Sequence, residues 1–166
     1  MLSFSVDNTN VMVRTAGLAV RDGHVLLQRL ADQSFWFLPG GRIEANETSA
    51  EALRREMREE LSAEVQPERL LWIVEHFFID ALLARFHELG FYWSMRFSDD
   101  SPWNQLEGVR NVFVDGHEME YAWHPIAQLR TLTVYPEFLP DGLQNLPDHP
   151  QHIMLRRGAP EADASA

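Results

Sequence analysis

The chain has 166 residues, 45% of them hydrophobic, which is enough to bury a sizeable core and predicts one domain rather than two. Its formal net charge of −11 and its pI near 5.0 argue against binding to nucleic-acid backbones, because that affinity comes from cationic groups. The sequence contains neither lysine nor cysteine, which excludes Schiff-base chemistry, a P-loop lysine, disulfides, thiolate catalysis and cysteine-ligated zinc.

The first forty residues predict a β-hairpin followed by a tight loop. Val11–Val20 and Val25–Arg29 are short hydrophobic runs separated by Asp22-Gly23, a dipeptide typical of two-residue hairpin turns. The aromatic run Phe35–Phe37 comes next and has two interpretations, a surface that holds a nucleobase or, in the leading interpretation, the hydrophobic floor of the loop. A Leu-Pro-Gly-Gly turn then closes this part of the chain at Gly41.

Residues 48–61 have the sequence pattern of an amphipathic helix. Thr48 and Glu51 form a capping box at its start, and good helix formers follow without glycine, proline or a β-branched residue. Apolar residues one turn apart make the stripe that should face the core: Leu53, Met57 and Leu61.

A second stripe of the same helix carries three carboxylates: Glu56, Glu59 and Glu60. Residues three and four apart are neighbours on a helix, so these carboxylates should lie side by side, partly shielded from water. Like charges at this spacing each cost roughly 0.2–0.5 kcal/mol, and a bound cation would remove that cost. Oxygen-only ligands favour Mg2+, with Mn2+ as a substitute. The alternative interpretation is a solvated acidic face balanced by the arginines of the same helix.

The second half of the chain predicts further strands and shorter helices. Arg69–Ile79 and Phe86–Phe97 are rich in β-branched and aromatic residues and predict two long strands. The stretch Ser98–Asp115 predicts a long loop or flap, in which Trp103 is a candidate for stacking on a nucleobase or for packing back on the domain. Short helices are expected at 125–130 and 136–144. Strands and helices interleave irregularly, so we expect an α/β fold with a mixed sheet covered by helices on both faces.

The carboxylate helix and the loop before it resemble the Nudix box, G-x5-E-x7-R-E-U-x-E-E-x-G-U, in which U is aliphatic. The matching residues, at the same spacing, are Gly41, Glu47, Arg55-Glu56-Met57 and Glu59-Glu60. The motif covers 41–63 and departs from the family pattern at Ser62, where the family has glycine, and at Ala63, which is small for an aliphatic position. Serine must adopt the left-handed conformation at a cost or leave the helix by another path, so we expect altered geometry rather than lost activity.

The resemblance implies a Nudix-like α/β/α sandwich that hydrolyses a nucleoside diphosphate derivative by metal-assisted attack of water. It implies that Glu56, Glu59 and Glu60 hold Mg2+, or Mn2+ in its place. It also implies that Arg55 braces these carboxylates through charged hydrogen bonds, and that Glu47 supports the loop or a further metal ion.

Substrate contacts and a general base have to come from other positions. In the absence of lysine, arginine must supply the charged phosphate contacts. The expected substrate-binding residues are Gly40, Gly41, Arg29 and Arg42. The resemblance places the base on a carboxylate outside the motif, for which Glu120 ranks first, Glu118 second and Glu88 third.

Two functions are compatible with these residues. The leading hypothesis is a Mg2+-dependent pyrophosphohydrolase, and the alternative is a non-catalytic nucleotide-sensing module on the same fold. The retention of Arg55 together with all three carboxylates favours the enzyme. ADP-ribose, a nucleoside triphosphate and a sugar nucleotide all stay open as substrates.

Partners and location follow from the same features. The expected partner is a small-molecule nucleotide derivative, with no nucleic acid and no membrane, and a homodimer is the expected assembly by similarity to the family. No basic, apolar leader and no run of about 18 apolar residues occurs, so a cytoplasmic location is expected. We expect a single catalytic domain over 1–157 and a disordered tail over 158–166, which is small, polar and without periodicity.

Overall fold

A computed structural model describes residues 1–80 and 82–157, and the predicted tail at 158–166 lies outside the described residues. In chain order the strands are β1 (Ser3–Val6), β2 (Thr9–Arg21), β3 (His24–Leu30), β4 (Phe35–Phe37), β5 (Gly40–Arg42), β6 (Val65–Ile79), β7 (Arg85–Phe97), β8 (Val109–Val114), β9 (His117–Pro125), β10 (Thr133–Tyr135) and β11 (Gln151–Arg157). The helices are α1 (Ser49–Leu61) and α2 (Leu139–Gly142), with 3-10 turns η1 (Pro102–Asn104) and η2 (Ile126–Thr131).

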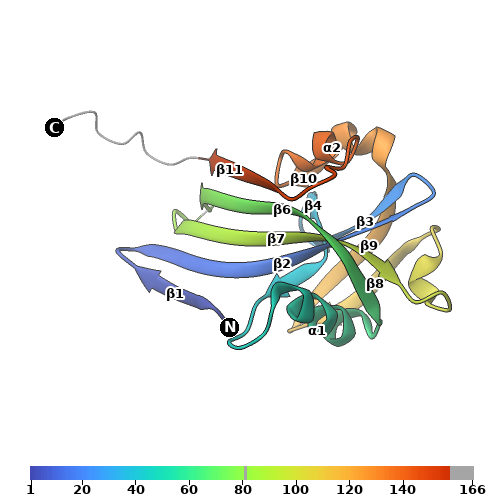
Figure 1. Ribbon diagram of the computed structural model, residues 1–166, viewed down its shortest axis with the longest axis horizontal. Helices are drawn as coiled ribbons and strands as arrows, with labels where there is room; N and C mark the ends of the chain where they lie inside the picture. Colours follow the sequence, from blue (N-terminus) through green and yellow to red (C-terminus); the bar gives the residue numbers. More distant parts are fainter. Residues whose placement is uncertain (81, 158–166) are drawn as a thin grey trace.

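The strands form a mixed sheet in the order β10-β4-β3-β2-β7-β6-β11 (Figure 1). Strands β2 and β7 are parallel, as are β6 and β11, and β4 and β10, whereas β6 and β7 are antiparallel. Strands β1 and β5 pair with β2, and β9 joins β3 to β8. The long strand β2 pairs with β3 at its end and with β7 along most of its length, so it joins the two halves of the sheet.

The predicted hairpin is confirmed in β2 and β3, which pair with Val20 opposite Val25. Its turn residues Asp22 and Gly23 have φ angles of 47° and 73°, as a type I′ turn requires. A second Asp-Gly turn, at 115–116, joins β8 to β9, so the prediction of a loop across Ser98–Asp115 is wrong for its last third. An Asp-Gly dipeptide indicates a hairpin with a strand on each side, but the polar composition of the segment led to the prediction of a loop.

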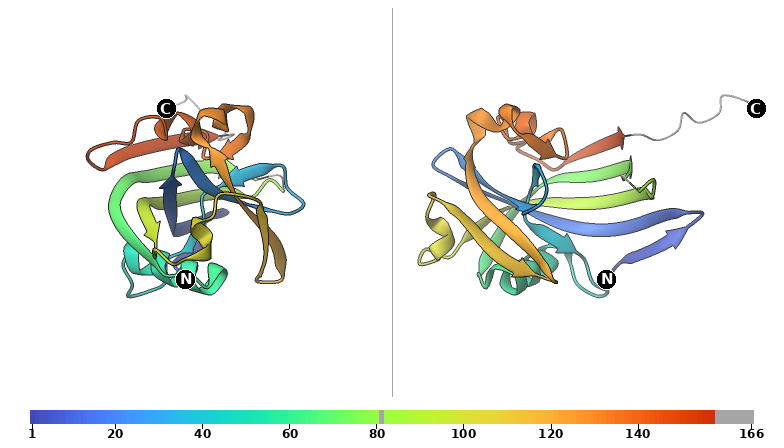
Figure 2. Two further views of the ribbon diagram at one scale, coloured as in Figure 1. Left: turned by 90° about the vertical axis from the view of Figure 1, so that its right-hand side faces the viewer. Right: turned by 180° about the vertical axis from the view of Figure 1, so that it is seen from behind.

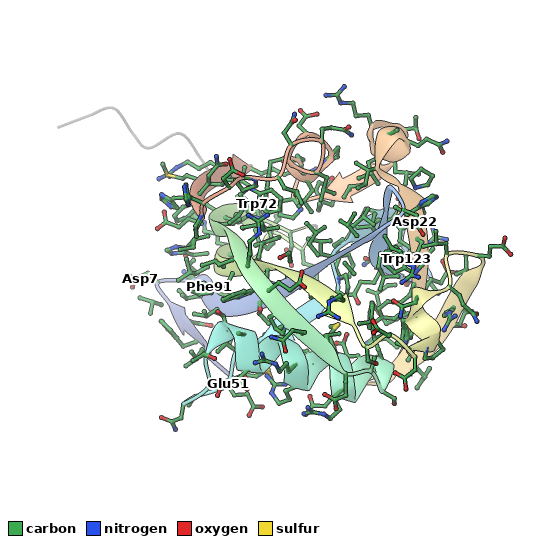
Figure 3. All side chains as sticks on the ribbon, turned by 45° about the vertical axis from the view of Figure 1, so that its right-hand side comes forward. Asp7, Asp22, Glu51, Trp72, Phe91 and Trp123 are labelled. Carbon is green, nitrogen blue, oxygen red and sulfur yellow. The ribbon has the colours of Figure 1, made fainter. Side chains whose placement is uncertain are left out.

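Helices cover both faces of the sheet, as predicted (Figure 1, and from behind in Figure 2). On one face α1 buries Leu53, Met57 and Leu61, which confirms the apolar stripe. On the other face η2 and α2 pack their leucines into a cluster around Trp72, whose indole lies between the sheet and α2 (Figure 3). The helix predicted at 125–130 has the expected length but is a 3-10 helix, and the one predicted at 136–144 is shorter than expected, with four residues. No helix in the described part is long and apolar enough to span a bilayer.

Helix α1 begins at the predicted capping box. The hydroxyl of Thr48 accepts a hydrogen bond from the Glu51 amide at 3.3 Å, and the Glu51 carboxylate accepts one from the Thr48 amide at 2.8 Å. At the other end Ser62 adopts the left-handed conformation, with φ 49° and ψ 37°. The residue that replaces glycine in the motif therefore keeps the helix exit at the cost of backbone strain.

Trp103 closes the same end of α1 and is 6% exposed. Its indole Nε1 donates to the carbonyl of Leu61 at 3.0 Å, and its ring packs against Phe97 and Tyr121. The hypothesis that Trp103 stacks on a nucleobase is therefore wrong, and the packing interpretation is confirmed. The indole also satisfies a carbonyl that the helix leaves without an intrahelical partner.

Replacing Ser62 by glycine should stabilise the protein. Left-handed strain costs a residue with a Cβ roughly 1–2 kcal/mol, and the extra unfolded-state entropy of glycine offsets roughly 0.5–1 kcal/mol of the gain. We expect a net gain of about 0.5–1 kcal/mol, seen as a rise of a few degrees in the melting temperature by circular dichroism. Ser62→Ala, which keeps the Cβ, is the matched control and should show no rise. A Ser62→Gly variant that melts below the wild type would contradict the assignment of strain.

Candidate functional site

The carboxylate of Glu56 lies under the loop that precedes α1. Its side chain is 13% exposed, and it fills the space in which a Cβ on Gly41 would stand. At Gly40 the backbone has φ 149°, and a Cβ there would overlap the backbone carbonyl of Thr15. The two glycines thus have different roles, since Gly40 lets β5 approach β2 closely and Gly41 leaves space for the carboxylate of Glu56.

Arg55 joins the motif residues in one network. Its guanidinium donates to Glu47 at 2.7 Å, to Glu56 at 2.8 Å, to Glu59 at 3.0 Å and to the carbonyl of Arg42 at 2.9 Å. The hydrogen bond to Glu47 is the largest of the causes that raise the pKa of Arg55 further above its ordinary value. The predicted brace is present for Glu56 and Glu59, and Glu47 belongs to it, whereas Glu60 accepts its hydrogen bond from Tyr121 instead. Glu59 is the most exposed of the three motif carboxylates on α1, at 60%.

Glu60 lies one turn from Glu56, on the side of α1 that faces β9. The hydroxyl of Tyr121 donates to its carboxylate at 3.1 Å. Burial, followed by the negative charge of Glu56, raises the pKa of Glu60 to about 7. Burial also raises the pKa of Glu56, while the hydrogen bond from Arg55 lowers it. In both cases the ionised form lacks full compensation from the protein.

These observations fit a hard divalent cation. The donors are carboxylate oxygens, and a positive ion beside Glu56 and Glu60 would offset the burial that disfavours their charge. Within 1–80 and 82–157, no three acidic or histidine side chains already converge as a preformed metal cluster. The carboxylates instead form an acidic ridge, defined as Glu56, Glu59 and Glu60, to which substrate phosphates would add further oxygen ligands.

The role of Gly41 gives a direct prediction. Gly41→Ala should displace the Glu56 carboxylate by the size of a methyl group without disturbing the fold, because that carboxylate is the far end of a flexible side chain. A misplacement of about 1 Å can cost roughly 100-fold in turnover, so we expect a loss of that order in a steady-state phosphate-release assay. Gly40→Ala is the contrasting variant and should lower the melting temperature, because its Cβ meets backbone. Full activity in Gly41→Ala would show that the Glu56 position is not required.

Two of the predicted site residues lie away from the acidic ridge. Arg29 and Glu120 face each other across β3 and β9 and form an ion pair with Nε and Nη2 each 2.6 Å from the same carboxylate oxygen. The Arg29 guanidinium stacks over Trp36 at 4.6 Å. Since neighbouring residues of a strand point to opposite faces, Glu120 lies on the other side of β9 from Tyr121, which contacts Glu60.

The remaining predicted site residues, Glu118, Arg42 and Glu88, also lie in different parts of the structure. Glu118 is exposed and accepts a hydrogen bond from Asn111 at 2.8 Å, on the outer hairpin. The backbone carbonyl of Arg42 accepts a hydrogen bond from Arg55, while the exposed side chain of Arg42 lies near Met1. Glu88 is buried in β7. The structure therefore brings together the residues of the motif itself and leaves the first two candidates for the base apart from them.

A residue that sequence reasoning missed, Arg14 on β2, connects the acidic ridge to a cavity. Its charge lowers the pKa of both Glu56 and Glu60, and its Nη1 lies 3.6 Å from the carboxylate of Glu88. Arg14 and Glu88 line a cavity of about 820 Å3, as does Tyr92. An arginine within the hydrophobic run Val11–Val20 was the available signal, because an unpaired charge in a buried strand is costly.

Comparison with known proteins agrees with the motif. The model of the NUDIX domain family matches residues 11–143. The chain is 48% identical over 46 residues to an 8-oxo-dGTP diphosphatase of Proteus vulgaris, covering 28% of this chain and 41% of that protein. It is 37% identical over 70 residues to 8-oxo-dGDP phosphatase NUDT18 of Homo sapiens, covering 41% of this chain and 22% of that protein. Each match therefore spans less than half the length of the relative.

The fold is similar to that of a MutT protein from Bacillus halodurans, with a TM-score of 0.58 and 16% identity over 89% of this chain and 91% of that one. At that identity the likeness concerns the fold alone. The family model, by contrast, covers β2 to α2 and so includes the loop, the carboxylate helix and both long strands. The chain belongs to the Nudix hydrolase family.

Proposed function

We propose that the chain is a Mg2+-dependent pyrophosphohydrolase that cleaves the diphosphate linkage of a nucleoside diphosphate derivative by attack of water. The observation that carries this proposal is the pair of partly buried carboxylates, Glu56 and Glu60, whose ionised forms need a cation. Burial raises the pKa of both carboxyls, as do the negative charges of Glu59 on Glu56 and of Glu56 on Glu60. Their oxygen donors suit Mg2+ and Mn2+ alike.

The residues of the chain would each contribute a defined part. A bound divalent ion would polarise a phosphoryl oxygen and lower the pKa of a bound water. Arg55 holds Glu47, Glu56 and Glu59 in place before substrate arrives, so these charges need no reorganisation during the reaction. Arg14 lowers the pKa of Glu56 and Glu60 and also lines the cavity, so its guanidinium is placed to contact a substrate that reaches from the acidic ridge into the cavity.

The class of substrate is proposed only as far as the diphosphate. The relatives named above act on oxidised guanine nucleotides. The match to each of them covers less than half of its length, so those activities do not identify the substrate of this chain. A panel of nucleoside triphosphates, 8-oxo-dGTP, ADP-ribose and a UDP-sugar samples the chemistry that the site admits.

The experiment is a hydrolysis assay of this panel with chromatographic separation of the nucleotide products. With Mg2+ or Mn2+ we expect at least one substrate to be cleaved at a phosphoric anhydride bond, and with EDTA no cleavage. Reaction in water enriched in 18O should place the label on one phosphate product. A nucleotide-sensing module would bind members of the panel without cleaving them, and that outcome would overturn the proposal.

A further inference from the structure

The cavity beside the acidic ridge has walls suited to a planar ring. Its volume of about 820 Å3 is within the usual range for a small-molecule site. Aromatic side chains line it from both halves of the sheet: Phe35 and Phe37 of β4, Tyr135 of β10, and Phe78 of β6. Flat aromatic faces of this kind stack on nucleobases with little regard to sequence.

Buried polar groups whose hydrogen-bonding capacity the protein does not fill lie among these aromatic walls. Glu88 of β7 stands directly opposite His76 of β6, and both line the cavity. Glu88 is 6% exposed and His76 is 9% exposed. The Nε2 of His76 and the Nε of Arg14 are buried and make no hydrogen bond. Buried polar atoms are nearly always paired in folded proteins, so this group indicates a ligand that completes it.

The Glu88 carboxylate is the acceptor in this group. Its ion pair, with Arg14, spans 3.6 Å, which is longer than a charged hydrogen bond. Within 1–80 and 82–157 no side chain other than Arg14 donates to it, although a carboxylate can accept two parallel hydrogen bonds. Arg14 offsets its charge through one oxygen and leaves the rest of this capacity unused.

We infer that this cavity is a nucleobase site that selects guanine, with Glu88 accepting from the N1–H and the 2-amino group and Arg14 donating toward O6. This inference rests on the proposed function, because it assigns the base of the same substrate. Guanine presents two adjacent N–H donors on its Watson–Crick edge. Adenine and cytosine each place a ring nitrogen lone pair beside their amino group, and uracil flanks its single N–H with carbonyls, so each would turn an acceptor toward the carboxylate.

The test measures binding of GMP, AMP, CMP and UMP to the full chain in EDTA, by calorimetry, so that neither metal nor turnover is needed. A bidentate contact of this kind discriminates by roughly 1–3 kcal/mol, which corresponds to roughly 5- to 150-fold in affinity. We expect GMP to bind at least about 10-fold more tightly than the other three. Equal binding of all four would overturn the inference and leave the cavity to another part of the substrate.

A variant and a ligand control identify the contact. Glu88→Gln keeps the size of the side chain, but its amide has one acceptor oxygen and its NH2 would face the second N–H donor of guanine. The preference for GMP over AMP should therefore fall to a few-fold. Glu75→Gln is the matched control, because Glu75 neighbours His76 on β6 and contacts His152 rather than the cavity. A Glu88→Gln variant that retains the full preference would overturn the inference.

The ligand control keeps the wild-type protein and so does not depend on folding of a variant. We expect 1-methyl-GMP to lose the advantage over AMP, and IMP, which lacks the 2-amino group, to bind between GMP and AMP. Tight binding of 1-methyl-GMP would contradict the proposed contact. Failure of the proposed function looks different, since it would be an absence of hydrolysis with Mg2+ whatever base the cavity prefers.

Discussion

Glu60→Gln should lower turnover at least about 100-fold while leaving the fold intact. Loss of outer groups around a metal site already costs roughly 10- to 100-fold, and a ligand should cost no less. The fold should survive because α1 keeps its apolar stripe and Tyr121 can still donate to the amide oxygen. Stability should not fall, since burial already disfavours the charge that the substitution removes. Steady-state kinetics and thermal unfolding, measured on the same preparation, check both parts.

Glu56→Gln should behave in the same way. The matched control is Glu64→Gln, an exposed carboxylate just beyond the same helix that pairs with Arg58. We expect its turnover to stay within about twofold of the wild type, because a change at an exposed residue outside the site has little effect. Unchanged turnover in either Glu56→Gln or Glu60→Gln would remove that residue from the metal site.

The second large effect is expected at Arg55. Arg55→Ala removes the donor shared by Glu47, Glu56, Glu59 and the carbonyl of Arg42, which leaves partly buried carboxylates in mutual repulsion. Breaking a fully buried pair costs roughly 3–5 kcal/mol, and because Arg55 is 22% exposed we expect roughly 2–3 kcal/mol from urea unfolding. Turnover should fall at least about 100-fold, because the carboxylates lose their fixed positions.

Arg55→Lys distinguishes the effect of the positive charge from the effect of the hydrogen-bond geometry of the guanidinium. Lysine keeps the charge but cannot reproduce the fork of hydrogen bonds, so most of both losses should remain. Arg58→Ala is the control on the same helix, since its pair with Glu64 is exposed and should contribute less than about 1 kcal/mol. An Arg55→Lys variant with wild-type turnover would show that a positive charge alone suffices at this position.

The sequence predicted α1 and its carboxylates closely because those features are local. The capping box, the apolar stripe and the spacing of the acidic residues all lie within fourteen residues, and short-range geometry determines them. The β2–β3 hairpin was predictable for the same reason, since an Asp-Gly turn selects its own conformation. The network around Arg55 followed from the motif rather than from local geometry.

The misses depend on contacts that are distant in the chain. Trp103 binds the carbonyl of Leu61, 42 residues earlier, and no local pattern indicates that contact. The sequence also does not reveal which face of β9 Glu120 takes, because a one-residue difference in strand register decides it, and in the structure Tyr121 has the position that contacts Glu60. The group around Glu88 was equally hidden, because Arg14, His76 and Glu88 come from three strands whose alignment the sequence does not reveal.

The most direct test of this account is calorimetric titration of Mn2+ into the wild-type chain and into a Glu56→Gln, Glu60→Gln double variant, each with a methylene-bridged nucleoside diphosphate that resists hydrolysis. We predict saturable binding to the wild-type chain and binding at least about 10-fold weaker in the double variant. Absence of binding to the wild-type chain, or equal binding to both, would contradict the claim that the buried carboxylates of α1 hold the catalytic cation.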